Sequence, residues 1–225
     1  VYFFGGNMKK LLLAVIVSLS TVTTAALAEI KVGIILGFTG PIESLTPAMR
    51  DGARMAFDEA SNSGNLLGGE SITILEADST CVDSAAATAA AEDLVAQGVT
   101  AIMGADCSGV TGAINANVAV PNGILMVSPS ATSPGLSKVP DNGTFWRTAP
   151  SDAKGGQVLA KLALSRGIES IAVTYTNNDY GKGLAEVFEA SFARGGGTIT
   201  ASAAHEDGKA DYSSEVGVLA SAGGD

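Results

Sequence analysis

The chain has 225 residues, of which 46% are hydrophobic and 16% charged, and its formal net charge is −10 at pH 7. This length and hydrophobic content allow one large domain or two small ones with a packed core. A strongly acidic chain lacks the basic surface that nucleic acids require, so we expect no nucleic-acid partner.

The start of the chain has the pattern of a secretory signal peptide. Met8 and two lysines are followed by an apolar run over residues 11–19 and by Ala26-Leu27-Ala28. A basic start, a short apolar core and a small-x-small end are typical of a cleaved leader. The alternative is an uncleaved membrane anchor, but a span needs about 20 apolar residues, and serines and threonines interrupt this run. We expect residues 1–28 to be upstream residues and a signal peptide, cut after Ala28.

Residues 30–127 predict alternating strands and helices. The nearly continuous apolar run at 30–36 is typical of a strand buried on both faces. Thr46-Pro47 predicts a helix start with Thr46 as the cap, and Asp83 is expected to cap an alanine-rich helix ending at Gly98. Further elements are expected as strands at 72–75, 99–103 and 124–127 and a helix at 110–118. This order predicts a parallel sheet with helices on both faces.

The chain contains two cysteines, Cys81 and Cys107. A small even number of cysteines outside the cytoplasm favours a disulfide. The alternatives are two buried free thiols or a metal pair. A metal needs more ligands than two, and the one histidine, His205, lies far from both cysteines in the sequence. We therefore favour a disulfide and expect no metal site.

A change in composition indicates a second lobe. Residues 128–144 are rich in Pro, Ser, Gly and Thr, and together with 145–148 they are interpreted as a crossover. Ser151 or Asp152 is expected to cap the next helix, and Asp179 the one after it. The expected elements are helices at 152–166, 180–194 and 212–220 and strands at 168–175 and 198–203. We expect a first lobe over 29–148 and a second over 149–225. Because the chain ends where another strand of the second lobe should begin, we expect it to be a C-terminally truncated fragment.

Two loops of the first lobe are candidates for ligand binding, because ligands of open α/β sheets bind at the carboxyl ends of the strands. The loop after the third strand leads through Ser108 into a helix whose first N–H groups suit a carboxylate. Ser108 as a simple helix cap is the alternative. The loop after the fourth strand, with Ser130, Ala131 and Thr132, exposes hydroxyls and carbonyls, although an ordinary turn has the same composition. Both loops together, in a secreted two-lobed chain, predict a binding site.

Catalytic motifs are absent from the sequence. There is no Gly-x-Ser-x-Gly elbow. Residues 181–183 read Gly-Lys-Gly without the flanking glycines of a P-loop or a dinucleotide fingerprint. His205 lies beside Glu206 and Asp207 and is expected to be solvated rather than a general base. We expect no enzymatic activity and no cofactor.

At these residues the chain resembles the periplasmic leucine/isoleucine/valine-binding proteins of bacterial ABC transporters. The resemblance runs from Glu29 to the end of the chain. It rests on an ordered series of segments: Ile30-Lys31-Val32-Gly33, Thr39-Gly40-Pro41, Asp51-Gly52-Ala53, Gly68-Gly69, Cys81, Cys107-Ser108, 123–129, Ala131-Thr132, Arg147-Thr148 and 180–185. Each segment is short, and it is their order that is specific to the family.

The resemblance implies an α/β fold of the two-lobed type I periplasmic binding protein class, each lobe a parallel sheet flanked by helices, closing around an amino acid. It also implies that Cys81 and Cys107 form the family's disulfide. Ser108, Ser130 and Thr132 match positions that hold the ligand's carboxylate and ammonium, Ser130 acting through its backbone, with Ala131 between them. Tyr180 matches an aromatic that lines the cleft from the second lobe, with packing at a helix start as the alternative. Leu45 departs from the family, whose close members often place an aromatic there over the ligand side chain.

The function expected from this resemblance is that of a periplasmic solute-binding protein. It would capture a small amino acid, of the branched-chain or aliphatic type, and deliver it to an inner-membrane ABC permease, acting as a monomer. Two alternatives remain at this point. One is the ligand-sensing ectodomain of a receptor with the same fold, and the other is a secreted hydrolase of the α/β type.

Overall fold

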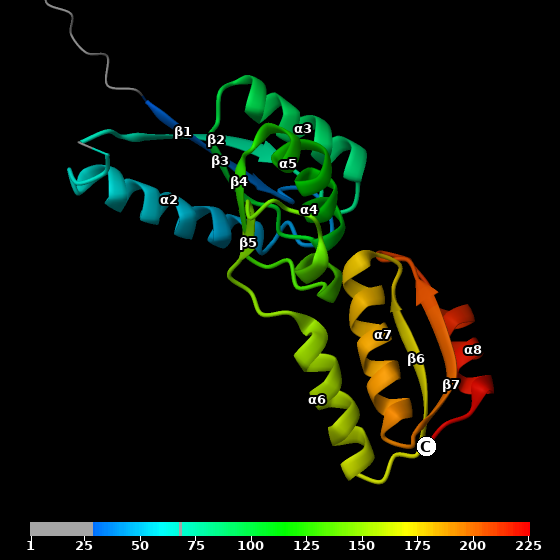
Figure 1. The fold of residues 1–225 in the computed structure, drawn as a ribbon. Helices are drawn as coiled ribbons and strands as arrows, with labels where there is room; N and C mark the ends of the chain where they lie inside the picture. The colour runs from blue at the N-terminus through cyan, green and yellow to red at the C-terminus, as the bar shows by residue number, and fades with distance from the viewer. Residues whose placement is uncertain (1–28, 68) are drawn as a thin grey trace, which may run out of the picture.

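A computed structural model describes residues 29–67 and 69–225. The expected signal peptide and its cleavage site fall on residues 1–28 and lie outside the described residues. Two parallel sheets form the centres of two lobes, as Figure 1 shows, which confirms the expected α/β class. Within residues 29–67 and 69–225, no helix combines the length and the apolar character needed to cross a bilayer.

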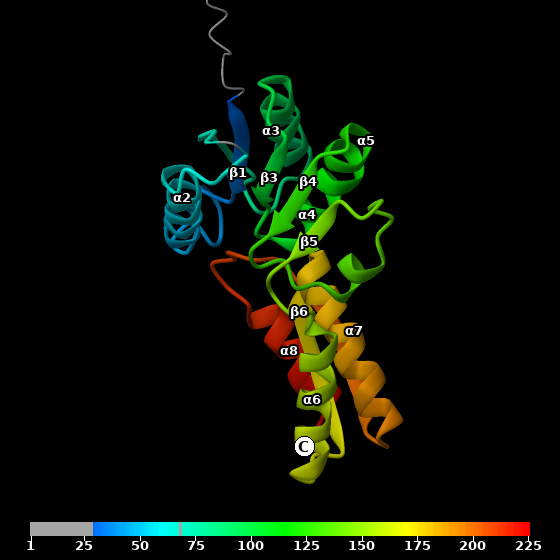
Figure 2. The same ribbon diagram turned by 60° about the vertical axis from the view of Figure 1, so that its left-hand side comes forward.

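The first lobe is built on a five-stranded parallel sheet with the strand order β2-β1-β3-β4-β5. Its strands are β1 (Ile30–Leu36), β2 (Ile72–Asp78), β3 (Ala101–Gly104), β4 (Leu125–Ser128) and β5 (Phe145–Arg147). Helix α2 (Thr46–Asn62) lies on one face, and α3 (Ser84–Ala96), α4 (Ser108–Ile114) and α5 (Val120–Asn122) lie on the other (Figure 2). The chain moves toward one edge of the sheet from β1 to β2 and toward the opposite edge from β2 to β5. Because connections between parallel strands are right-handed, these opposite directions place α2 on one face and the later helices on the other.

The core of the first lobe lies between the sheet and α3 and α4. Ile35, Leu94, Ile102, Ile114 and Met126 are at most 1% exposed. The predicted third helix is one continuous helical stretch in which a π-helical turn, η1 (Asn115–Ala119), joins α4 to α5. The carboxyl ends of β1, β3 and β4 therefore lie side by side above a packed core, where they hold their loops in fixed positions.

Two expectations for the first lobe are wrong. The segment 145–148 was expected to be only crossover, but Phe145–Arg147 pairs with β4 as the edge strand β5. Thr46 is not the cap of α2: the cap position is Leu45 and carries no side-chain cap bond, whereas the Thr46 hydroxyl donates to the Glu43 carbonyl at 3.1 Å. By contrast, Asp83 caps α3 as expected, accepting from the N–H groups of Ala85 and Ala86.

The second lobe has a two-stranded parallel sheet, β6 (Ser170–Thr176) and β7 (Thr198–His205). Helices α6 (Asp152–Ser165) and α7 (Asp179–Arg194) cover one face, and α8 (Ser213–Ala222) covers the other (Figure 1). Phe188 and Phe192 of α7 stack at 5.7 Å in the core of this lobe. Ser151 caps α6, one of the two expected candidates. Asp179 is not a cap, because Asn178 caps α7 by accepting from the Gly181 N–H at 2.9 Å.

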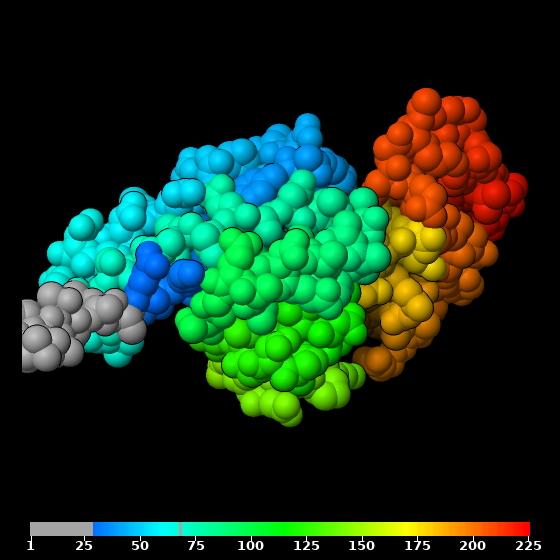
Figure 3. Space-filling model, turned by 90° about the horizontal axis from the view of Figure 1, so that it is seen from above, coloured from blue at the N-terminus to red at the C-terminus, as the bar shows by residue number. Residues whose placement is uncertain are grey.

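The two lobes meet at the start of α7. A Cβ atom on Gly183 would lie 2.9 Å from Cδ of Pro134 and 3.0 Å from Oγ of Ser133, so the absence of a side chain lets α7 approach this part of the first lobe. In the space-filling view of Figure 3, an open notch separates the light-blue surface of the first lobe from the orange-red surface of the second. The lobes thus touch on one side and are separated on another.

Candidate functional site

The loops that follow four strands of the first sheet are joined at Asp106. Its carboxylate, on a residue only 3% exposed, accepts from the N–H of Gly37 at 2.9 Å and from the hydroxyl of Ser79 at 3.3 Å. It also accepts from the N–H of Cys107 at 3.0 Å. The Asp106 carbonyl accepts from the hydroxyl of Ser130 at 3.0 Å. A buried carboxylate is tolerated when its oxygens are hydrogen-bonded in this way, so Asp106 fixes the loops relative to one another.

Sequence reasoning did not single out Asp106. The signal available was an acidic residue placed directly after the apolar strand end, between Ala105 and Cys107. That signal does not say what the carboxylate binds, because Gly37 lies 69 residues away in the chain and Ser79 lies 27 away.

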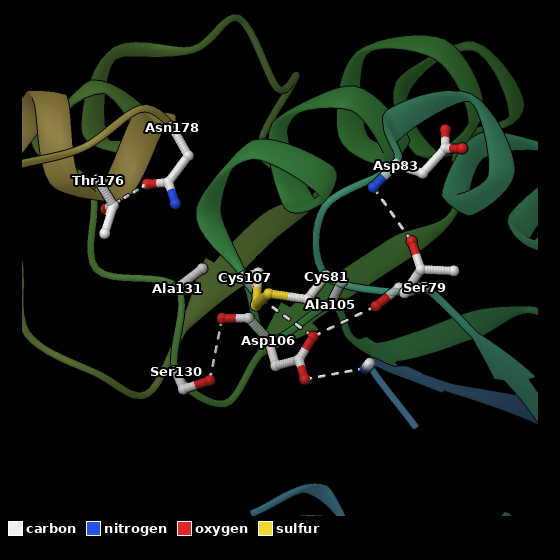
Figure 4. The surroundings of a disulfide bond; sticks show 12 residues. Ser79, Cys81, Asp83, Ala105, Asp106, Cys107, Ser130, Ala131, Thr176 and Asn178 are labelled. Atoms are coloured by element: carbon white, nitrogen blue, oxygen red, sulfur yellow. Dashed lines mark hydrogen bonds between the residues drawn. A yellow bond between two sulfur atoms is a disulfide. The ribbon is translucent and has the colours of Figure 1, made fainter. Parts of the chain in front are cut away.

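The disulfide between Cys81 and Cys107 is present, as expected, with the two Cα atoms 5.2 Å apart. It links the loop after β2 to the loop after β3, beside Asp106 (Figure 4). In the same view, Ser130 and Ala131 lie on the neighbouring loop, with Thr176 and Asn178 of the second lobe beyond Ala131. The disulfide is therefore part of the surface that the first lobe turns toward the second.

Ser108 is the first residue of α4 and is 2% exposed. It is not the helix cap, because the cap position belongs to Cys107, which makes no side-chain cap bond. The Ser108 hydroxyl oxygen accepts instead from the N–H of Ser133 at 3.1 Å. A hydroxyl has one proton to donate in addition to its acceptor sites, so Ser108 keeps a donor for an anionic group while it ties two loops together.

The loop after β4, here called the 128–133 loop, contains the other first-lobe candidates. The Ser130 hydroxyl is used by the Asp106 carbonyl, which leaves the Ser130 backbone as its means of binding a ligand. Ala131 is 1% exposed, and its N–H donates to the Ser128 hydroxyl at 3.0 Å. Thr132 is half-buried, and its carbonyl accepts from the Asp152 N–H at 3.0 Å. The structure brings this loop and Ser108 together through the bond from Ser133.

Tyr180 comes from the second lobe, as the second residue of α7, and is 46% exposed. Leu45, directly before α2, is 56% exposed. Neither side chain belongs to the packed cores of the two lobes. Both are therefore available to a ligand rather than committed to the fold.

A cavity of about 480 Å³ lies where α7 meets the first lobe. Of the five candidate ligand residues only Ser108 lines it; the remaining wall includes Ser133, Pro134, Lys138 and Asp179. Its volume is in the range of small-molecule sites. The other four candidates do not line it. The cavity therefore adjoins the candidate site at Ser108 but is not the same site.

No group of three or more histidine, cysteine or acidic side chains suited to a metal occurs among residues 29–67 and 69–225. His205 is half-buried, and its Nδ1 lies 2.7 Å from the Thr174 hydroxyl. The ring also meets Tyr212 edge-on, with the centroids 5.7 Å apart. His205 thus stays partly exposed, in keeping with the expectation, and its ring also has two neighbours, Thr174 and Tyr212.

Known proteins are similar to this chain in sequence and architecture. The sequence profile of the family described as periplasmic binding protein matches residues 29–225. The Leu/Ile/Val-binding protein BraC3 of Rhizobium johnstonii is 32% identical over 205 residues, which are 91% of this chain and 55% of the relative. The chain thus spans about half the length of the curated relatives it matches. These relatives are named as binding proteins and not as enzymes.

Solved structures agree with the two-lobed arrangement. The branched-chain amino acid substrate-binding protein LivJ of Streptococcus pneumoniae, solved with isoleucine, has a TM-score of 0.73 and 27% identity, covering 88% of this chain and 55% of its own. A solute-binding protein of an ABC transporter from R. palustris, solved with 4-hydroxybenzoate, has a TM-score of 0.72, 20% identity and coverage of 87% and 52%. The fold is that of the type I periplasmic binding proteins, and the chain belongs to the periplasmic binding protein family.

Proposed function

We propose that this protein is an extracytoplasmic solute-binding protein that captures an amino acid with an aliphatic side chain and delivers it to an ABC permease. The observation that carries the proposal is the meeting of Ser108 and the 128–133 loop at the carboxyl edge of the first sheet, linked by a 3.1 Å bond from the Ser133 N–H. The names of the more similar relatives, which bind Leu, Ile and Val, support the choice of ligand class.

In this proposal the first lobe binds the charged end of the amino acid. The hydroxyl of Ser108, the backbone of Ser130 and the polar groups of Thr132 surround the carboxylate and ammonium, with Ala131 as the loop residue between them. Buried charges need complete hydrogen bonding, and a loop with its own carbonyls already satisfied can offer its N–H groups to a carboxylate. Tyr180 would line the cleft from the second lobe, and closure of the lobes would be driven by contacts made only when both meet the ligand.

The side-chain end of the ligand is proposed to face Leu45. An exposed leucine offers apolar surface without a hydrogen-bonding group, which suits an aliphatic side chain. The structural neighbour solved with 4-hydroxybenzoate shares the fold at 20% identity, and one fold hosts many ligands. The preference for an aliphatic amino acid therefore rests on the residues at this end of the cleft and on the closer relatives.

We further propose that residues 1–28 direct secretion and are cleaved after Ala28, that the first and second lobes span 29–148 and 149–225, and that the protein works as a monomer in the periplasm. A disulfide between Cys81 and Cys107 fits an oxidising compartment. Mass spectrometry of the secreted protein would test the cleavage site, since an N-terminus other than Glu29 would contradict it.

The site is tested by calorimetric titration of leucine into variants of the natural full-length protein. Ser108→Ala and Thr132→Val remove one hydroxyl each, and we expect each to weaken binding by about tenfold, as for a lost hydrogen bond to a charged group. Ser84→Ala is the matched control, because Ser84 is the first residue of α3 and is exposed on the first lobe. Unchanged affinity in both site variants would overturn the assignment of these residues.

A further inference from the structure

The segment that joins the two lobes also holds the 128–133 loop. Strand β5 ends at Arg147, and α6 of the second lobe begins at Asp152, so residues 147–152, here called the crossover segment, carry the chain from one lobe to the other. The side chains of Arg147 and Thr148 and the N–H groups of Thr148 and Asp152 donate hydrogen bonds to the first lobe. In this link the crossover segment supplies the donors and the 128–133 loop supplies the carbonyl acceptors.

Five of the six carbonyls of the 128–133 loop accept hydrogen bonds from the crossover segment. The bonds are Thr148 N–H to Ser128 at 3.0 Å, Thr148 hydroxyl to Pro129 at 3.2 Å, Arg147 Nη1 to Ala131 at 3.1 Å, Asp152 N–H to Thr132 at 3.0 Å and Arg147 Nη1 to Ser133 at 2.8 Å. Nη2 of Arg147 also donates to the Ser137 hydroxyl at 2.5 Å. Such a set fixes the orientation of nearly every peptide unit in the loop.

The orientation of a peptide unit decides where its N–H group points. In a trans peptide the carbonyl of one residue and the N–H of the next lie in the same plane and point in opposite directions. Arg147, by holding the Ala131 carbonyl, therefore turns the Thr132 N–H to the opposite side. Thr148, by holding the Pro129 carbonyl through its hydroxyl, does the same for the Ser130 N–H. These two N–H groups belong to candidate ligand residues.

The charge on Arg147 adds to this effect. The guanidinium is half-buried; burial lowers its pKa, and the nearby Asp152 carboxylate opposes that shift. Bonds from a charged donor are stronger than neutral ones, and a donor on the carbonyl side polarises the N–H of the same peptide unit. One oxygen of Asp152 is buried without a hydrogen-bond partner among the described residues. Arg147 therefore does not donate to this oxygen, and its Nη1 group donates to the loop carbonyls instead.

We propose that Arg147 and Thr148 are positioning residues that aim the N–H groups of Thr132 and Ser130 at the ligand and couple the 128–133 loop to movement of the second lobe. This inference rests on the proposed function for its ligand. Neither residue needs to touch the amino acid. When the lobes close, a change in the path of the crossover segment is transmitted to the loop through the five hydrogen bonds to its carbonyls. A ligand that accepts hydrogen bonds from the N–H groups also strengthens the bonds to the carbonyls of the same peptide units.

The test uses Arg147→Met, Arg147→Lys and Thr148→Val in the natural full-length protein, with Arg194→Met as the control for an exposed arginine at the end of α7. Amide resonances are recorded first without ligand. We expect Thr148→Val to shift the Ser130 amide and leave the Thr132 amide in place, and Arg147→Met to shift the Thr132 amide. Arg147→Lys should restore part of the Thr132 position, because lysine keeps the charge but not the forked geometry.

Leucine affinity is then measured for the same variants. Arg147→Met should weaken binding by about tenfold, the loss expected for hydrogen bonds from a charged donor, whereas Arg194→Met should bind as the parent does. If Arg147→Met does not fold, the amide shifts and leucine affinity of Thr148→Val test the proposal. This variant is expected to fold, because it exchanges a hydroxyl for a methyl group of similar size on an exposed residue.

The outcomes separate this inference from the function on which it rests. If the parent protein binds no amino acid but the residue-specific amide shifts appear, the proposed function fails and the positioning of the N–H groups stands. If the parent binds leucine and the variants either bind as tightly or shift the Ser130 and Thr132 amides without distinction, the positioning proposal is overturned.

Discussion

The carboxylate of Asp106 accepts a hydrogen bond from the N–H of Gly37 at 2.9 Å, although the two residues are 69 positions apart. Gly37 follows β1 and Asp106 follows β3, and these strands are neighbours in the sheet. The bond joins two loops directly at the edge where the candidate ligand residues lie. A single buried side chain thus stabilises the frame of the site without belonging to its ligand contacts.

We predict that Asp106→Asn destabilises the first lobe by about 1–3 kcal/mol, because an amide in place of the carboxylate leaves a buried donor facing other donors. The measurement is urea unfolding followed by the fluorescence of Trp146, the one tryptophan of the chain. Asp58→Asn, on the exposed side of α2, serves as the control. Equal midpoints for the two variants would show that Asp106 does not hold the loops together.

Reduction of the disulfide should also destabilise the first lobe. Cys81 and Cys107 are separated by 26 positions, and closing a loop of that size stabilises by about 3–4 kcal/mol in the chain-entropy model. We expect dithiothreitol to lower the free energy of unfolding of the parent by that amount and so to lower its urea midpoint. A variant with both cysteines changed to alanine should unfold at the reduced midpoint with or without the reductant. A midpoint that does not respond to reductant would contradict the pairing.

Two helical glycines should respond oppositely to alanine. A Cβ atom on Gly52 of α2 would meet no atom within 4 Å, whereas the Cβ of an alanine at Gly183 would lie 2.9 Å from Pro134. Gly52→Ala is expected to stabilise by about 0.5–1 kcal/mol through the helix preference of alanine. Gly183→Ala gains the same preference but pushes α7 away from the first lobe. Thermal unfolding by circular dichroism should rise only for Gly52→Ala; an equal rise for both would refute the close contact.

Stability at acid pH should depend on Asp78. Burial alone would raise the pKa of Asp78, but hydrogen bonds from Thr39 and Thr80 outweigh it and hold the pKa below its usual value. A folded pKa below the unfolded one gives stability that is complete above about pH 4, the unfolded pKa, and that is lost as the pH falls through the folded pKa. Asp78→Asn should therefore lower stability at pH 7 and flatten its loss below pH 4.

The measurement is the urea midpoint at intervals between neutral pH and pH 2.5, with Asp93→Asn, an exposed position on α3, as the control. The parent and the control should lose stability in parallel as the pH falls. If Asp78→Asn follows the same curve as they do, the hydrogen bonds of Thr39 and Thr80 do not depress the pKa of Asp78.

The sequence pattern predicted most elements of both sheets, because several strands are apolar runs and some helices, such as α3, have a clear cap residue. The strand predicted at 30–36 has the same bounds as β1, and Asp83 caps α3 as predicted. Strand β5 escaped prediction because it has three residues, and its alternation of buried Phe145 and exposed Trp146 is too short to detect. The cap of α7 was misplaced by one residue because Asn178 and Asp179 have similar capping preferences.

The candidate site was predictable only in part. Topology alone implied that the loops after β3 and β4 would be neighbours, and the bond from the Ser133 N–H to Ser108 joins them. The roles of Asp106 and Arg147 were not predictable, because each depends on contacts with loops whose positions are set by the folded sheet. Ser108 was weighed as a helix cap, a role that local sequence cannot distinguish from a bond to a distant loop.

Calorimetric titration of the natural full-length protein with leucine, isoleucine, valine, phenylalanine and a short amide tests the proposed function most directly. We predict one-to-one binding of an aliphatic amino acid with a micromolar or tighter dissociation constant, and weaker binding of phenylalanine and the amide. A folded protein that gives no binding heat with any aliphatic amino acid, and that binds the amide instead, would contradict the proposal.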